Sequence, residues 1–371
     1  MTAKLEIVLT TTLSLVEQFQ STLASPQANP QPTTSEQGKD LDPLPLLSAS
    51  STALKSHVTK LSLVAINSPF TPSVVSTTLS TLNESVLPSL VTAALLVTPE
   101  SHTKAFQTEI CVNTSAALKE LYLLVREVQV VAQEKADKKS LEQSDKITVT
   151  VAAGRVWDAC DVLTDVATKG VIGFVVRRAQ QYRDLVRDAV EEIEAWDPDE
   201  EEDEFFDDLL SDGERDPGDK GKDGGGTGSD EDDGEEESAT LHSQKKDTLR
   251  ILKPVAQIYP AIISNRLKKA PALLTPANIR ALELLLKSLQ QIPDHIDEVA
   301  GALYEVDFGK LSSQLGKTKM CANRALDLVV MPWNTRHLEA EDKFTTWCQT
   351  WTKVMEEVTK SIDESSRVRS N

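Results

Sequence analysis

A single acidic tract constrains how this chain can fold. Residues 197–237 contain 21 aspartates and glutamates and three basic residues, so the tract carries a charge of −18, whereas the whole chain of 371 residues carries −19. The tract also holds eight of the 15 glycines. Such a segment cannot bury enough apolar surface to offset the entropy lost on ordering. We therefore expect a disordered acidic linker at 197–241 between two foldable halves, 1–196 and 242–371.

The apolar residues of both halves recur with a helical period. The clearest example is the segment 171–194, where the spacing of three and four residues favours packing in a helical bundle. Its inward positions are Val175, Ala179, Tyr182, Val186, Ala189 and Ile193. Little of the chain alternates with the period of two that indicates strands. We predict an all-α fold, made of two helical bundles or of one bundle completed from both halves.

Proline and glycine punctuate the predicted helices. In the first half we predict helices at about 5–20, 47–67, 72–97, 99–136, 145–168 and 170–196, with a polar, flexible loop at about 25–45. In the second half we predict them at about 243–268, 276–291, 294–304, 307–331 and 336–365. Thr-Pro pairs at 71–72, 98–99 and 275–276 favour helix starts, because threonine caps free amides and proline suits the first turn. Gly170 is placed to separate two helices.

Membrane and secretion signals are weak. The most apolar stretch, 86–97, falls short of the roughly 18 residues that span a bilayer, so we expect a buried core helix. The N-terminal residues lack the basic-then-apolar order of a secretory signal. The four cysteines lack the paired spacing of a zinc site or a disulfide framework. We therefore expect an intracellular protein without a membrane segment, in which these thiols are free and buried.

Catalytic motifs are missing from the sequence. The five histidines, at 57, 102, 242, 295 and 337, show no metal-binding spacing, and no glycine-rich phosphate loop or nucleophile motif is present. Cys160 lies close to Asp158 and Asp161, which would raise the pKa of the thiol and oppose its activation. We expect no enzyme activity, no cofactor and no metal.

Four apolar residues inside the acidic tract form a candidate docking segment. They are Phe205, Phe206, Leu209 and Leu210. Apolar side chains among carboxylates are typical of segments that dock into a partner's groove. Extension of the preceding helix, packed back onto the bundle, is the open alternative. Ser211 and Ser229 precede acidic residues and are candidate phosphorylation sites of the kind that acidophilic kinases use.

Nucleic acid is a disfavoured partner. A strip of arginines at 177, 178, 183 and 187 is interleaved with carboxylates, and the neighbouring tract would compete for it. Trp347 and Trp351 lie on the apolar stripe of the last helix, which favours core packing over an aromatic docking patch. The cyclin-docking pattern Arg-x-Leu occurs at 250–252, 280–282 and 324–326, each time with the leucine on a helix face that we expect to be buried.

The stretch Gly154-Arg155-Val156-Trp157-Asp158-Ala159-Cys160-Asp161 resembles a segment of the cyclin-D-binding protein family, the Grap- and cyclin-D-interacting proteins (GCIP). The helix that follows, through residues 187–194, is also similar, as is the order of helical, acidic and helical regions. The motif positions shared with the family are Gly154, Val156, Trp157, Ala159, Cys160 and Asp161. The resemblance implies an all-helical, non-enzymatic protein of nucleus and cytoplasm that binds D-type or related cyclins and other regulators and restrains cell-cycle transcription.

Two other functions agree with the composition. The tract would suit a factor that binds histones or other basic proteins, in which case binding should be sensitive to salt. The long amphipathic helices would also suit a structural bundle of the vinculin or catenin type. All three hypotheses describe protein–protein contacts rather than catalysis.

Overall fold

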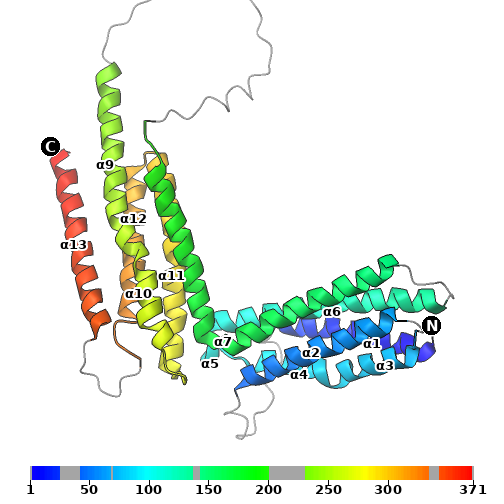
Figure 1. The fold of residues 1–371 in the computed structure, drawn as a ribbon. Coiled ribbons are helices and arrows are strands. Elements are labelled where there is room, and N and C mark those ends of the chain that lie inside the picture. The colour runs from blue at the N-terminus through cyan, green and yellow to red at the C-terminus, as the bar shows by residue number, and fades with distance from the viewer. Residues whose placement is uncertain are drawn as a thin grey trace, which may run out of the picture. The chain divides into compact units, whose positions relative to one another are not determined.

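The computed structural model describes residues 2–25, 42–67, 70–136, 143–199, 230–333 and 342–369 (Figure 1). The regular elements of these residues are all helices, which confirms the predicted all-α fold. The chain forms two compact units, one of Met1–Val175 with Leu273–Glu283 and the other of Val176–Ala272 with Leu284–Asn371. Residues 176–196, at the end of the first predicted half, are thus grouped with helices that follow the acidic tract.

The first unit is a helical bundle. Helix α1 (Ala3–Ala24) packs against α6 (Lys104–Ala136) and α3 (Pro72–Thr81), while α2 (Pro43–Ile66) packs against α4 (Leu87–Leu96). The sequence explains this arrangement, because apolar residues spaced by three or four positions form one stripe along each helix. On α1 the buried stripe is Leu5, Leu9, Leu13 and Val16.

A π-helical turn, η2 (Leu82–Val86), joins α3 and α4 without a break. Asn83 on this turn donates from Nδ2 to Thr12 Oγ1 of α1 at 2.9 Å. The combined segment Pro72–Leu96 is long and apolar enough to cross a membrane by length and composition, and 44% of its most apolar window is buried inside the structure. The core helix of a soluble protein meets the same criterion. Leu87 and Leu90 are fully buried, in agreement with the core helix predicted at 86–97.

Local capping sets where helices begin. Helix α2 starts at Pro43 rather than at 47, because the Asp42 carboxylate accepts a hydrogen bond from the Leu44 amide at 3.0 Å. The helix predicted at 99–136 is divided into α5 (Pro99–His102) and α6, because Thr103 adopts a φ of 74°. The Thr103 hydroxyl then accepts a hydrogen bond from the Phe106 amide at 3.2 Å as α6 begins.

Helix α7 (Gln143–Ala195) contains both helices that were predicted at 145–168 and 170–196. It is kinked at Gly170, whose φ of 62° and ψ of −166° lie outside the helical region, so the predicted break is confirmed. The apolar stripe predicted at 171–194 is largely buried, and so is a stripe of apolar residues before the kink. The fully buried members are Val156, Leu163, Val175, Ala179, Val186 and Ile193.

The second unit holds the end of α7, most of α11 (Pro276–Tyr304), and four further helices: α9 (Asp230–Ala256), α10 (Ile258–Asn265), α12 (Phe308–Asp327) and α13 (Lys343–Arg369). A 3₁₀ turn, η4 (Leu267–Lys269), follows α10, and α9 contacts α12 and α13. Tyr259 is fully buried and donates its hydroxyl to the Leu289 carbonyl at 2.8 Å.

Proline has different effects on α9 and α11. The helix predicted at 243–268 is divided between Pro254 and Pro260, because α9 ends at Ala256 and α10 begins at Ile258. Helix α11 instead runs through Pro293, so the two helices predicted at 276–291 and 294–304 are one. Complete burial of Ile292 and Ile296 beside this proline offsets the cost of the lost backbone hydrogen bond.

The last helix packs through its aromatic residues. Trp351 is buried and donates from Nε1 to the Pro254 carbonyl at 2.9 Å, as the core-packing interpretation requires. Trp347 stacks on Phe344 with a centroid separation of 5.6 Å. The described part of this helix begins at Lys343 rather than at 336, since residues 334–341 lie outside the described residues.

Candidate interaction surfaces

The family-like motif on α7 has a buried side and an exposed side. Val156 and Cys160 face the core, whereas Asp158 and Asp161 are exposed and Gly154 and Ala159 are partly exposed. Asp161 forms an ion pair with Lys55 of α2 at 2.6 Å. Because both charged groups are solvated, this pair contributes less than about 1 kcal/mol to the free energy of unfolding. The motif therefore serves packing through one face and leaves the other face available.

The indole of Trp157 is partly buried, and its Nε1 is one of the buried polar atoms that have no hydrogen-bond partner among the described residues. The thiol of Cys160 is free and buried, and burial raises its pKa to about 12 with a smaller contribution from the Asp161 charge. The predicted direction of this shift is thus confirmed, although burial is its main cause. A thiol with this pKa is protonated at neutral pH and is a poor nucleophile.

Three large apolar side chains lie on the exposed side of α7 before its kink. Ile147, Val151 and Val162 are 54%, 50% and 45% exposed, and Arg155 and Asp158 lie between the last two along the same face. We call these five residues the α7 stripe. Apolar side chains that gather on a surface with charged neighbours are typical of protein-binding sites. The charged members favour a protein partner over a lipid surface.

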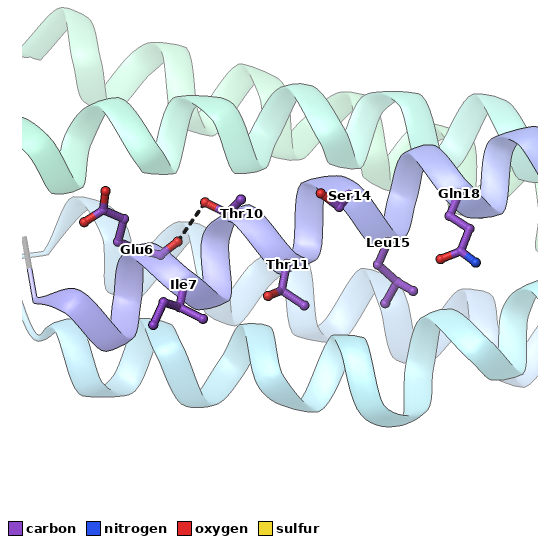
Figure 2. Close-up of a pocket in the computed structure, with 7 residues that line it drawn as sticks. All are labelled: Glu6, Ile7, Thr10, Thr11, Ser14, Leu15 and Gln18. Carbon is purple, nitrogen blue, oxygen red and sulfur yellow. Dashed lines mark hydrogen bonds between the residues drawn. The ribbon is translucent and has the colours of Figure 1, made fainter.

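A second candidate surface is a shallow groove of about 560 Å³ over α1. Figure 2 shows its seven lining residues along one face of that helix, namely Glu6, Ile7, Thr10, Thr11, Ser14, Leu15 and Gln18. Thr10 uses its hydroxyl to donate to the Glu6 carbonyl of its own helix at 3.0 Å. With one carboxylate and several hydroxyls, the groove lacks paired acid and base groups for catalysis.

A third surface is basic. His242, Lys245, Lys246, Leu249, Arg250 and Lys253 line a groove of about 420 Å³ on α9, and we call them the α9 stripe. This surface was not predicted from the sequence, although its cations recur at helical spacing and could have indicated it. The end of α7 lies against it. The Lys253 ammonium pairs with Glu194 at 2.7 Å, and the Lys245 ammonium donates to the Trp196 carbonyl.

The docking segment predicted at Phe205, Phe206, Leu209 and Leu210 lies outside the described residues, as do Ser211 and Ser229. These assignments therefore remain predictions. The described residues at the start of the acidic tract end at Asp199. Its carboxylate accepts a hydrogen bond from Ser238 and lies 2.9 Å from Nε2 of His242. These contacts hold the pKa of Asp199 below its usual value.

The described structure explains two other sequence patterns. In the arginine strip of α7, Arg183 pairs with Asp184 at 2.8 Å. Arg187 lies within ion-pair distance of Asp184, Asp188 and Glu191. The leucines of the three Arg-x-Leu patterns, Leu252, Leu282 and Leu326, are buried. These leucines pack in the core, which agrees with the expectation that the patterns are not docking motifs.

One group of side chains has the donor types of a metal site. Asp197, Asp199 and His242 bring three such atoms within 4.8 Å of one another, and all three residues are exposed. The hydrogen bond of Asp199 to Ser238 and its contact with His242 account for this clustering without an ion.

Residues 46–199 match the family model described as Grap2 and cyclin-D-interacting, N-terminal. Over these residues the chain is similar to the GCIP family, which supports a GCIP-like protein. The match contains α2 to α7, and therefore the α7 stripe, the Lys55–Asp161 pair and the complete motif at 154–161. It confirms the resemblance that these residues indicated. A comparison with curated proteins returned no match.

Proposed function

We propose that this protein is a non-enzymatic regulator of the nucleus and cytoplasm that binds a D-type or related cyclin through its GCIP-like region and thereby restrains cell-cycle progression. The observation that carries the proposal is the family match over residues 46–199, since the family is described as cyclin-D-interacting. It supports protein–protein contact as the function of this region. No catalytic role is needed to explain the surfaces described above.

The α7 stripe is the proposed contact surface. It lies inside the matched region, shares Arg155 and Asp158 with the motif at 154–161, and exposes three large apolar side chains. Such apolar side chains contribute favourable binding free energy when a partner removes them from water. The charged residues between them would fix the orientation of the partner.

The test is a binding measurement with the full-length protein and a purified D-type cyclin. Val151→Asp should weaken binding by about tenfold or more, because it places a carboxylate in the centre of the apolar contact. Ile7→Asp on α1 is the matched control, since Ile7 is also exposed but lies outside the matched region. It should bind like the unmodified protein.

Two results would contradict different parts of the proposal. Failure of the unmodified protein to bind any D-type cyclin would remove the proposed function. Equal binding by the unmodified and Val151→Asp proteins would agree with the proposed cyclin binding but would exclude the α7 stripe as the contact surface. Circular dichroism of both variants checks that the helices remain folded.

A further inference from the structure

The α9 stripe is a concentration of positive charge in a strongly acidic chain. Its residues, at 242, 245, 246, 249, 250 and 253, lie on one helix face over roughly 16 Å. Leu249, which is partly buried, lies in the middle of the cations. The surface is therefore suited to an acidic segment that also carries apolar side chains.

The chain that enters the acidic tract already supplies carboxylates to this face. Glu194 pairs with Lys253, and Asp199, the last described residue at the start of the tract, pairs with His242. Both contacts are made by α7 and the residues directly after it. They place the beginning of the tract beside the stripe.

Other cations of the stripe are less well neutralised. Within the described part of the chain, Lys246 is exposed and forms no hydrogen bond or ion pair. Arg250 contacts Asp247 of its own helix at 3.1 Å and Ser361 of α13 at 3.4 Å. Additional carboxylates can therefore bind here without displacing the contacts of Glu194 and Asp199.

We propose that the α9 stripe is the docking site of the chain's own acidic segment 200–210. This segment contains seven carboxylates, no basic residue and four apolar residues, which complement the cations and Leu249. Thirty residues separate Asp199 from Asp230, so chain length does not restrict its reach. Covalent attachment gives the segment an effective concentration in the millimolar range, which makes individually weak contacts sufficient.

Docking would withhold the segment from partners. Phe205, Phe206, Leu209 and Leu210 would contact the stripe until a basic protein or a groove of higher affinity displaced them. The inference goes beyond the proposed cyclin contact, because it concerns the second unit and remains testable if no cyclin binds.

Lysine acetylation rates in the full chain, measured by mass spectrometry, test the proposal. Neutralising the seven carboxylates of 200–208 with glutamine and asparagine should raise the rates of Lys246 and Lys253 by about threefold. Lys119 on α6 should be unaffected. The matched control neutralises the seven carboxylates of 230–237, which changes the charge equally and should leave both stripe lysines protected.

Unchanged rates in the first variant would overturn the proposal. Equal acceleration in both variants would also overturn it, because long-range charge rather than docking would then explain the protection. Carbodiimide treatment of the dilute unmodified protein gives an independent result. Docking predicts zero-length crosslinks from Lys246 or Lys253 to residues 200–208, and their absence at low salt would contradict it.

Discussion

Among single residues of the second unit, Arg266 joins several segments of the described chain. Its side chain is 3% exposed and donates to the carbonyls of Val329 and Val330 at 2.6 Å each. It also pairs with Asp342 at 2.7 Å, and its guanidinium lies 4.4 Å from the centroid of the Phe344 ring. One buried cation thus joins the residues that follow α12 to the start of α13.

This pair makes stability depend on pH. The Arg266 guanidinium, with hydrogen bonds from Thr345, holds the pKa of Asp342 well below its usual range. The unfolded chain therefore binds this proton at a higher pH than the folded chain does. The pair stabilises the fold above about pH 4 and loses its contribution as the pH falls further.

We expect Asp342→Asn to lower the free energy of unfolding at pH 7 by about 1 kcal/mol, a modest value because the Asp342 side chain is 41% exposed. The difference from the unmodified protein should shrink towards pH 2, because unfolding of the unmodified protein then lets the released carboxylate take up a proton. Urea unfolding of both proteins at pH 7, 4 and 2.5 measures this difference in the free energy of unfolding. A difference that stays constant over this range would show that the Asp342 charge does not contribute.

The Arg266–Asp342 pair also shows what could not be predicted from the sequence. Its two members are 76 residues apart, and neither belongs to a motif or a periodic pattern. By contrast, Cys160 lies next to Asp161, so the direction of its pKa shift could be predicted. Local spacing carries information about neighbours in the chain, whereas pairs between distant helices depend on the packing of the whole unit.

Among the helices, α7 is distinguished by its kink at Gly170. The φ of 62° and ψ of −166° there belong to a region that is almost exclusive to glycine. A Cβ atom built on Gly170 would lie 3.7 Å from Leu44 Cδ1, which is an ordinary contact. The constraint at this position is therefore the backbone conformation and not a lack of space.

We expect Gly170→Ala to lower the free energy of unfolding by about 1–3 kcal/mol. Gly154→Ala, in the same helix, should instead raise it by about 0.5–1 kcal/mol, because Gly154 is helical and a Cβ there meets nothing within 4 Å. Thermal unfolding of the two variants compares them directly. Equal stabilities would mean that α7 is not kinked at Gly170 in solution.

Helix boundaries could be predicted where a residue acts on its own backbone. Gly170 marks the kink, and the threonine of the Thr275–Pro276 pair accepts a hydrogen bond from the Asn278 amide at 3.2 Å, as a cap does. The break at Thr103 was missed because threonine rarely adopts a positive φ. The continuity of α11 through Pro293 was missed because burial of its apolar face outweighs the local preference of proline.

At the scale of the whole molecule, the second unit combines residues from both sides of the acidic tract. Both ends of the acidic tract belong to it, since its first range runs from Val176 to Ala272. The end of α7 contacts later helices at several points. Trp196 packs edge-on against Tyr304 with a centroid separation of 4.9 Å, and Glu194 pairs with Lys253 at 2.7 Å.

We therefore expect residues 1–199 and 230–371, expressed as two separate chains in one cell, to purify as a single complex. Each fragment alone should aggregate, because helices of the second unit would leave apolar faces uncovered. Size-exclusion chromatography with mass measurement tests this. Two soluble monomers eluting separately would show that the two sides of the tract fold independently.

The hydrogen bond between Asp199 and Ser238 bears on how freely the length and composition of the acidic tract can vary. Two residues that are 39 positions apart in the chain are therefore in direct contact, which closes a loop in the polypeptide. The entropy of closing such an excursion grows only with the logarithm of its length, so each doubling costs about 0.6 kcal/mol. The acidic insert can therefore be lengthened, shortened or recomposed at little cost to the helices on either side.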